Sequence, residues 1–355
     1  MNEINLEELI NAIKPADPTV KEATWEHWDS LCKPLRGFGL LEEMVVKLAG
    51  IQETSSPHCD KRAVVIMGAD NGVVEEGVSQ TDSSVTLQVL ENMGQKISSV
   101  CVMSKMIHAA VIPVNIGSNA DGRHPAIINI PVRYGTGNIA KGPAMTRKEC
   151  IQAIERGAKV VMDLKEKGYD IVLVGEMGIG NTTTSSACVA ALFNESVENV
   201  TGRGAGLSSE GLLRKIDAIE RALKVNQPDP GDPVDVIAKV GGLDIAGMVG
   251  CYLGAAACHM PAMIDGLISA LSAYCAYRLC PACRDYMFAS HATAEPAGKR
   301  IMEGLDLQPI LYAGMHLGEA TGAAAVLPLL DQALNVYYGL PGFADGNVEK
   351  YEHLK

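Results

Sequence analysis

The stretch of this chain with the clearest chemistry is residues 172–186, which read VLVGEMGIGNTTTSS. An apolar run ends at Gly175, small and polar residues follow, and an Ala-rich stretch then resumes helical spacing. This pattern predicts a strand, a tight turn and the N-terminus of a helix. Because glycines let the backbone approach a ligand and the positive end of a helix favours an anion, we expect a phosphate to bind at this turn.

The residues expected to contact the phosphate are Gly178, Gly180, Asn181, Thr182 and Thr183. Glu176 does not suit an anion site, since a carboxylate repels an anion unless it faces another part of the substrate, and it therefore indicates a second function in the same loop. The same turn is also typical of an ordinary structural connection between a strand and a helix. It is not a Walker loop, which needs Lys where Asn181 stands, and it lacks the GxGxxG pattern of a dinucleotide site.

Other loops follow the same logic. A second glycine-rich loop, GRGAG at 202–206, precedes a helical pattern at 208–224. Apolar runs at 63–67, 262–265 and 286–289 end in the polar segments GADNG, DG and SHATAEP. Ligands of open α/β sheets bind at the carboxyl ends of strands, so we expect a ligand site among these loops.

A sheet must position these loops. Apolar runs at 63–67, 108–116, 171–174 and 262–265 alternate with helical patterns at 83–106, 147–167 and 208–224. This alternation implies right-handed crossovers and a mostly parallel sheet. We predict an α/β fold: a mostly parallel open sheet with helices on both faces, Rossmann-like, plus a smaller helical subdomain built from the N- and C-terminal segments.

The chain divides into three predicted parts. Residues 1–60 read as amphipathic helices and form the helical subdomain, 61–330 form the α/β catalytic domain, and 331–355 form a tail that packs on the helical subdomain, with the last helix giving way near Asn335. The segment NQPDPGDP at 226–233 is predicted to be a linker. The Gly- and Ala-rich stretch 245–264 contains His259 and Pro261, and it indicates a closely packed buried helix leading into a strand rather than a membrane span.

Composition excludes several classes of protein. The formal charge of −12 opposes nonspecific nucleic-acid binding, which needs a basic surface. The N-terminus lacks the pattern of a secretory signal, and the 10 scattered cysteines are typical of free thiols, so we expect a cytoplasmic protein with no nucleic-acid or membrane partner. Cys280 and Cys283 have the spacing of a redox or half-zinc motif, but no second CxxC accompanies them. We expect no metal and no cofactor.

Seven segments together resemble the nicotinate-nucleotide:dimethylbenzimidazole phosphoribosyltransferase family, which builds the lower-ligand nucleotide of cobamides. In chain order they are GADNGVVEEGVS (68–79), GPAMT (142–146), GEMGIGNTT (175–183), GRGAGL (202–207), VGGLDIAGM (240–248), LCPACRDY (279–286) and LGEATGAA (317–324). The similarity extends from about residue 25 to 335. The third and last segments are highly specific when they occur in this order.

The resemblance implies transfer of phosphoribose from nicotinate mononucleotide to a cobamide base, with inversion at C1′ and release of nicotinate. A pyridinium leaving group departs with the C–N electrons, so the protein has to activate the nucleophile and hold the reactants in line. By resemblance the base that takes the proton is Glu319, and Glu176 orients the acceptor or stabilises positive charge on the ribose. Two neighbouring carboxylates would also raise the pKa of one of them.

The remaining site residues are also implied by the resemblance. The phosphate is expected on the turn at 178–183 and on Gly202 and Gly204, with Lys215 supplying a charge and with Asp265 and Thr293 near the nucleotide. Lys215, Asp265 and Thr293 each have an ordinary structural alternative, as a solvated helix lysine, a strand-end aspartate and a capping threonine. The residues expected at the acceptor base are Gln80, Ser83, Gln88 and Leu317.

The acceptor loop departs from the family pattern. Members that use benzimidazole commonly carry Gln-Glu-Val-Thr after EGVS, whereas this chain reads QTDSSVT at 80–86 and retains Gln88. Small hydroxyls thus replace long side chains. The acceptor is therefore open among dimethylbenzimidazole, a purine such as adenine, and a phenol such as p-cresol.

A second hypothesis belongs to a different class of protein. The departures cluster in the acceptor site, so the chain could be a non-catalytic or regulatory subunit that binds nucleotide beside an active paralogue. Retention of both Glu176 and Glu319 argues against this alternative. Gly- and Ala-rich helices permit close apposition, and the family forms dimers, so we expect a homodimer or a heterodimer with a paralogue.

Overall fold

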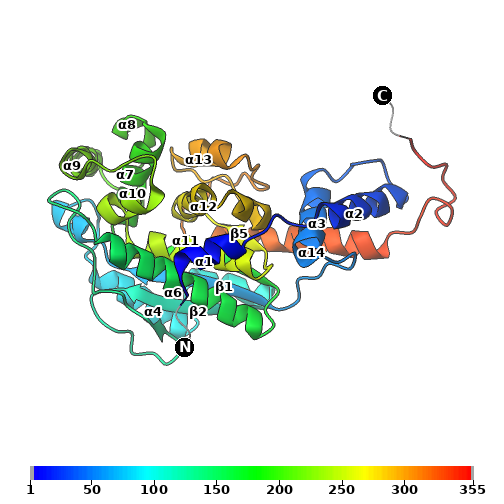
Figure 1. Ribbon diagram of the computed structural model, residues 1–355, viewed down its shortest axis with the longest axis horizontal. Coiled ribbons are helices and arrows are strands. Elements are labelled where there is room, and N and C mark those ends of the chain that lie inside the picture. The colour runs from blue at the N-terminus through cyan, green and yellow to red at the C-terminus, as the bar shows by residue number, and fades with distance from the viewer. Residues whose placement is uncertain (1–3, 353–355) are drawn as a thin grey trace.

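A computed structural model describes residues 4–352, and a six-stranded sheet forms its centre (Figure 1). The strands are β1 (Arg62–Ala69), β2 (Ala109–Gly117), β3 (Ile128–Asn129), β4 (Ile171–Met177), β5 (Ala262–Ile264) and β6 (Met287–Ala289). Their order is β3-β2-β1-β4-β5-β6, and every pairing is parallel. This order is that of a doubly wound Rossmann fold, whose winding reverses between β1 and β4. The predicted α/β class is confirmed.

The helices connect these strands and extend the chain at both ends. In chain order they are α1 (Leu6–Ala12), α2 (Pro18–Ser30), α3 (Leu40–Gln52), α4 (Ser84–Gly94), α5 (Ser99–Met106), α6 (Arg147–Glu166), α7 (Asn181–Phe193), α8 (Val197–Val200), α9 (Ser209–Asn226), α10 (Pro233–Val240), α11 (Leu243–Ala257), α12 (Leu267–Leu279), α13 (Gly298–Leu305) and α14 (Thr321–Gly339). Two short 3-10 turns, η1 (Gly72–Glu76) and η2 (Pro281–Tyr286), follow β1 and precede β6.

Helices cover both faces of the sheet, as adjacent residues of β1 show. A Cβ atom on Gly68 would lie 2.4 Å from Leu90 Cδ1 of α4. The preceding residue, Met67, instead faces α11, because a Cβ atom on Gly247 of that helix would lie 3.1 Å from Met67 Sδ. Successive strand residues point to opposite faces, so α4 and α11 lie on opposite sides. Helix α6 packs beside α11, and α5 and α14 contact each other and the sheet.

The face covered by α11 is packed unusually closely. A Cβ atom on Gly157 of α6 would lie 1.9 Å from the carbonyl oxygen of Gly247, and one on Gly250 would lie 1.9 Å from that of Ile154. Only glycine allows the two backbones to approach this far. Residues 243–256 of α11 are all buried, which confirms the predicted buried helix leading into β5. Within residues 4–352 no helix has the length and apolar character needed to cross a membrane.

Helices α2 and α3 lie beside the C-terminal half of α14, away from the sheet (Figure 1). The ring of Trp28 packs edge-on at 5.2 Å from that of Tyr337, and the N–H of Cys32 donates to the carbonyl of Pro341 at 2.9 Å. Helix α1 instead packs on α6 and α11. The three-part division of the chain at residues 60 and 330 stays a prediction, and residues 1–3 and 353–355 lie outside the described part.

Two predicted helix boundaries are wrong. The single helix expected over 83–106 is two helices, because the chain turns at Lys96, which has φ +65°, and Ser98 then caps α5 by accepting from the N–H of Cys101. The last helix does not give way near Asn335 but continues to Gly339.

The predicted linker at 226–233 also ends earlier than expected. Pro233 is the first residue of α10, and the carboxylate of Asp232 accepts from the N–H groups of Val234 and Asp235. Proline suits the first helical position because its missing N–H needs no partner there. A proline that indicates a break in the chain thus starts a helix.

Candidate active site

The turn between β4 and α7 has the predicted form. Glu176 lies within β4, and the turn begins at Gly178, where a Cβ atom would lie 2.6 Å from both the carbonyl oxygen of Ala69 and Asp244 Oδ2. Gly180 has φ +91° and directly precedes α7, a conformation that favours glycine. The 13-residue helix α7 therefore points its positive end at the carboxyl edge of the sheet.

A buried lysine joins this turn to the second glycine-rich loop. Lys215 Nζ donates to Thr182 Oγ1 at 2.9 Å and to the carbonyl of Gly202 at 3.1 Å. Gly204, at φ +53°, approaches Thr182 so closely that a Cβ atom would lie 2.8 Å from its Oγ1. Burial lowers the pKa of Lys215 to about 8, and the charge of Glu295 opposes that change. We call residues 178–182, the loop 202–206 and Lys215 the anion cradle.

Two carboxyl groups face the cavity beside the anion cradle. Glu176 Oε2 accepts from the side-chain amide of Asn181, and a Cβ atom on Gly318 would lie 2.5 Å from Glu176 Oε1. Oε2 of Glu319 is buried and has no hydrogen-bond partner among the described residues. Burial, followed by the charge of Asp244, raises the pKa of Glu176 to about 8, and burial followed by Asp265 raises that of Glu319. A carboxyl group with a raised pKa is a stronger base near neutral pH.

The loop that carries Glu319 has an uncommon backbone conformation. Three consecutive residues have positive φ: Gly318 (+87°), Glu319 (+57°) and Ala320 (+58°). For a residue other than glycine this conformation costs roughly 1–2 kcal/mol. Glycine at 175 admits the loop, since a Cβ atom there would lie 2.5 Å from the backbone nitrogen of Ala320. Retained strain of this kind is typical of functional sites.

Asp265 holds this loop in place. Its carboxylate accepts from the N–H groups of Ala320 at 3.1 Å, Gly322 at 2.8 Å and Ala323 at 3.1 Å. A carboxylate directly after β5 thus supplies hydrogen-bond partners to the free N–H groups at the start of α14. His291 lies beside it, with Nδ1 at 4.0 Å from Asp265 Oδ1. Asp265 therefore has a demonstrated structural partner in α14, and its contact with a nucleotide stays a prediction.

These groups surround a cavity of about 250 Å³ at the carboxyl ends of β4 and β5. The predicted site residues that line it are Gln80, Glu176, Gly178, Gly180, Asn181, Thr182, Gly204, Asp265, Thr293, Leu317 and Glu319. A larger cavity of about 920 Å³ lies between α3 and the segment around α13, and it shares Asp265 and His291 with the first. Its lining contains neither Glu176 nor Glu319, so the chemistry belongs to the smaller cavity.

Five predicted site residues do not line the smaller cavity. Lys215 and Gly202 lie behind its wall and bond to each other, and Thr183 is buried with an unpartnered Oγ1 among the described residues. Ser83 directly precedes α4, and Gln88 is exposed on that helix. The roles of these residues toward substrate stay predictions.

Several residues of the site were missed by the sequence analysis. Thr86 of α4 accepts from the N–H of Ile179 at 3.0 Å and so supports the turn between β4 and α7 from a distant segment. His291 and Glu295 line the cavity, and Asp244 is bonded to Asn181 behind it. The only signal for these residues was their presence in the polar loops or family segments, which gave them no role.

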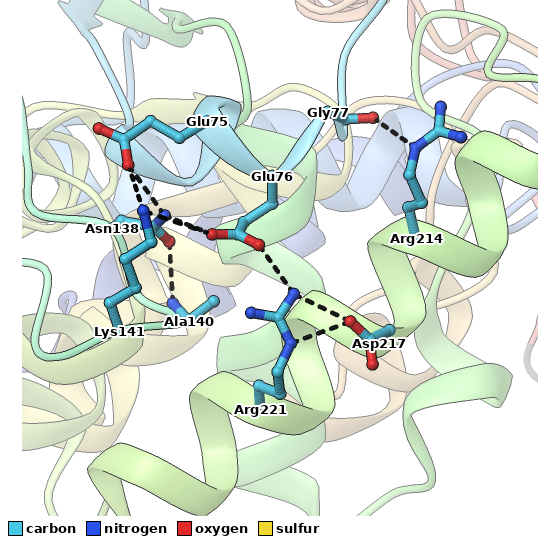
Figure 2. Close-up of polar contacts among 9 residues, drawn as sticks. All are labelled: Glu75, Glu76, Gly77, Asn138, Ala140, Lys141, Arg214, Asp217 and Arg221. Carbon is cyan, nitrogen blue, oxygen red and sulfur yellow. Dashed lines mark hydrogen bonds and ion pairs between the residues drawn. The ribbon is translucent and has the colours of Figure 1, made fainter.

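A charged network holds the segment that leads into the acceptor loop (Figure 2). Glu76, at the end of η1, accepts from Arg221 Nη2 at 2.8 Å and from Asn138 Nδ2 at 2.6 Å. Arg214 Nε donates to the carbonyl of Gly77 at 3.3 Å. Both arginines lie on α9, the helix that also carries Lys215.

The same loop touches the anion cradle further along. Gln80 Nε2 donates to the carbonyl of Ala205 at 3.2 Å and also to that of Gly206. Gln80 is exposed and lines the cavity. The acceptor loop and the segment that precedes it are therefore each bonded to elements that build the anion cradle.

The CxxC segment carries no metal-binding arrangement. Cys280 and Cys283 are free thiols, and Cys283 is buried in η2. Burial raises the pKa of both thiols, which makes them less reactive. No group of three or more His, Cys, Asp or Glu side chains within residues 4–352 could hold a metal ion.

Comparison with known proteins defines the class of enzyme. A family model described as "Phosphoribosyltransferase" matches residues 13–348, nearly the whole chain. The doubly wound sheet and the anion cradle at its switch point suit such an enzyme. The protein is thus a phosphoribosyltransferase, a member of the pentosyltransferases.

Named relatives make the assignment more specific. The nicotinate-nucleotide–dimethylbenzimidazole phosphoribosyltransferase of Ruminiclostridium cellulolyticum is 46% identical over 352 residues, covering 99% of this chain and 100% of the relative. That of Acetivibrio thermocellus is 48% identical over 324 residues, covering 91% and 92%. The crystal structure of CobT from Thermus thermophilus has a TM-score of 0.89 at 35% identity, covering 94% of this chain and 100% of that one. The chain belongs to the nicotinate-nucleotide–dimethylbenzimidazole phosphoribosyltransferase family, which confirms the resemblance of its motifs.

Proposed function

We propose that this enzyme transfers phosphoribose from nicotinate mononucleotide to an aromatic acceptor, giving an α-linked riboside 5′-phosphate and nicotinate for cobamide synthesis. The observation that carries the proposal is the shared cavity, which is lined both by residues of the anion cradle and by Glu176 and Glu319. The names of the relatives supply the substrates.

The donor would lie with its 5′-phosphate on the anion cradle. The N-terminus of α7 and the charge of Lys215 favour the dianion, and a bound phosphate in turn favours the protonated lysine. The ribose C1′ would then lie toward Glu176 and Glu319. Nicotinate leaves as a neutral pyridine ring with the C–N electron pair, so its departure needs no proton from the protein.

The acceptor would be activated by Glu319. Its unpartnered Oε2 is free to accept a proton from an incoming N–H or O–H group. The left-handed backbone at Gly318 and Glu319 and the bonds from Asp265 to α14 hold this oxygen in a fixed position. Such preorganisation aligns the acceptor for attack on the face of C1′ opposite nicotinate.

The test is release of nicotinate by the purified chain, with nicotinate mononucleotide and one acceptor at a time. The acceptors are dimethylbenzimidazole, adenine, phenol and p-cresol, because small hydroxyl side chains occupy the acceptor loop at Thr81, Ser83 and Ser84. We expect acceptor-dependent release with at least one of them. A chain that binds the nucleotide but shows no turnover with any acceptor would contradict the proposal and favour a nucleotide-binding subunit.

The proposal includes a dimer. Two apolar side chains near the cavities, Tyr312 and Leu317, are 71% and 56% exposed, which leaves apolar surface for a second chain to cover. We expect sedimentation equilibrium at micromolar concentration to give twice the monomer mass. A fully active monomer would contradict this part of the proposal, and activity that requires a paralogue would favour the heterodimer.

A further inference from the structure

Asp244 is a buried carboxyl group that the transfer outlined above leaves without a role. It lies in the first turn of α11, is fully buried and does not line the cavity. The side-chain amide of Asn181 donates to Asp244 Oδ2 at 3.1 Å and also to Glu176 Oε2. One amide therefore bridges a carboxyl group that faces the cavity and one that lies behind it.

Close backbone packing fixes the position of Asp244. A Cβ atom on Gly178 would lie 2.6 Å from its Oδ2, and one on Gly242 would lie 2.3 Å from its Oδ1. A side chain enclosed in this way cannot move to meet a substrate. Asp244 acts on the cavity only through Asn181 and through its charge.

Carboxyl groups from four elements face one another here, and we call them the carboxyl cluster: Glu176 of β4, Asp244 of α11, Asp265 after β5 and Glu319 before α14. Asp70, after β1, faces Asp244, and His291 lies beside Asp265. Among the described residues no Lys or Arg forms an ion pair with any member of the cluster. The carboxyl cluster is therefore a largely buried group of acidic side chains without a paired Lys or Arg in the described part of the chain.

This arrangement sets different protonation states on the two bridged groups. Burial, then the charge of Asp244, raises the pKa of Glu176 to about 8, whereas burial raises that of Asp244 only to about 6. The Asn181 amide opposes the increase in both pKa values, and Asp244 alone also accepts from backbone N–H groups. Of the two groups, Glu176 therefore holds a proton more tightly, and Asp244 ionises first.

We propose that Asp244 is a positioning residue that keeps a proton on Glu176 in the free enzyme, and that the positively charged pyridinium nitrogen of the bound nucleotide displaces this proton to solvent. The inference rests on the proposed function, because it requires a donor that carries positive charge. The O–H bond of the Glu176 carboxyl group breaks, its electron pair stays on the carboxylate, and the proton passes to water.

A nearby positive charge is sufficient for this displacement. An opposite charge within a few ångströms lowers a carboxyl pKa by about 1–3 units. The pKa of Glu176 would then lie at about 7 or below, so that the group ionises at pH 7. The carboxylate that forms faces the ribose, where positive charge develops as nicotinate departs. In this proposal Glu176 holds its proton while the site is empty and loses it once a pyridinium nitrogen lies beside it.

Isothermal titration calorimetry in buffers of different ionisation enthalpy counts the protons released on binding. The ligands are nicotinate mononucleotide and ribose 5-phosphate, at pH 7 and with no acceptor present. Ribose 5-phosphate brings the same phosphate to Lys215 without the pyridinium ring, so proton exchange at the phosphate and the lysine is common to both. We expect the nucleotide to release roughly half to one proton more than ribose 5-phosphate. Equal proton counts would overturn the inference.

Two variants assign the extra proton. Glu176→Gln removes the titrating group and should abolish the excess. Asp244→Asn keeps the shape of the side chain and removes its charge, so the excess should shrink at pH 7 and reach its maximum at a lower pH. The exposed Asp217→Asn on α9 is the matched control and should leave the proton count unchanged.

The outcomes separate the two proposals. If Asp244 were merely structural, Asp244→Asn would weaken donor binding while the extra proton and its pH dependence stayed as in the wild type, and that result would overturn its role. If the wild-type chain does not bind nicotinate mononucleotide at all, the proposed function falls and this inference falls with it. Binding with equal proton counts overturns the inference alone.

Discussion

The anion cradle and the carboxyl cluster adjoin the same cavity, meet at Asn181, and handle charge in opposite ways. The anion cradle uses the end of helix α7, glycine backbone and one buried cation, Lys215. The carboxyl cluster gathers Glu176, Asp244, Asp265 and Glu319 with no Lys or Arg paired to them among the described residues. Each group of residues has the charge opposite to that of its expected ligand group. The anion cradle suits a phosphate, and the carboxyl cluster suits a pyridinium nitrogen or a positively charged ribose.

The anion cradle and the carboxyl cluster also differ in how they are built. The anion cradle comes mainly from two local loop-to-helix turns, whose geometry is set by residues adjacent in sequence. The carboxyl cluster draws one side chain from each of four separate segments, and the bonds that Asp265 accepts from the start of α14 hold the strained loop at Glu319 in place. A substitution in the cluster should therefore change chemistry, whereas one in the cradle should change donor binding.

The largest expected effect is on Glu319. Glu319→Gln should lower turnover by roughly 10²–10⁴-fold, the usual contribution of a positioned general base, while donor binding persists. Acceptor-dependent nicotinate release and calorimetric donor binding measure the two separately. The loss should be smaller for a phenol already ionised at the assay pH. Near-normal rates on every acceptor would remove Glu319 from the chemistry and leave Glu176 as the candidate base.

Substitution of Lys215 tests the anion cradle. Lys215→Met fills the same space without a charge and should weaken nicotinate mononucleotide binding about 10- to 100-fold, because it removes the attraction between a buried charge behind Thr182 and the phosphate, about 1–3 kcal/mol at a separation of several ångströms. Turnover at saturating donor should change much less. Lys224→Met, at an exposed position on the same helix, is the control. A fall in turnover with unchanged donor affinity would show that the comparison between the anion cradle and the carboxyl cluster is wrong.

The pH dependence of stability reports the burial of Glu176. Its pKa of about 8 in the folded protein exceeds the ordinary value of 4.5, so the folded state holds an extra proton between these values, and the free energy of unfolding falls as pH rises through that window. Glu176→Gln removes this loss, on the order of a few kcal/mol. The Tm of the variant should exceed that of the wild type by a margin that grows from pH 5 to pH 8. A margin independent of pH would mean that Glu176 does not titrate there.

The smallest expected effect is in the network of Figure 2, which joins the acceptor loop to the helix of the anion cradle. Arg221→Gln breaks the ion pair to Glu76 and should raise the acceptor KM about two- to fivefold, since half-exposed pairs contribute up to about 1 kcal/mol. The donor KM should hold. Asp217→Asn removes only the neighbouring pair within α9 and is the matched control. Equal effects of both variants would show that the link between the loop and α9 does not position the acceptor.

Local sequence predicted some of these features well. The turn at Gly178 and Gly180 was predicted because glycine at a strand end followed by Asn and Thr fits few other structures, and α7 begins at Asn181 as expected. The alternation of apolar runs and helical patterns predicted the parallel sheet, and all six strands pair in parallel. The break between α4 and α5 was not predictable from periodicity, because both helices keep an apolar face and the turn at Lys96 carries no proline.

The sequence by itself determined the class of fold, the family and the glycine turn before α7, and it predicted Glu176 and Glu319 as the catalytic pair, because these inferences depend on residues close together in the chain or on motifs in a fixed order. Only the tertiary structure decided that Lys215 is buried between two loops, that Asp265 holds the start of α14, and that Asp244 shares an amide with Glu176. Burial and through-space charge depend on which elements the sheet order brings together, and no local pattern of residues specifies that order.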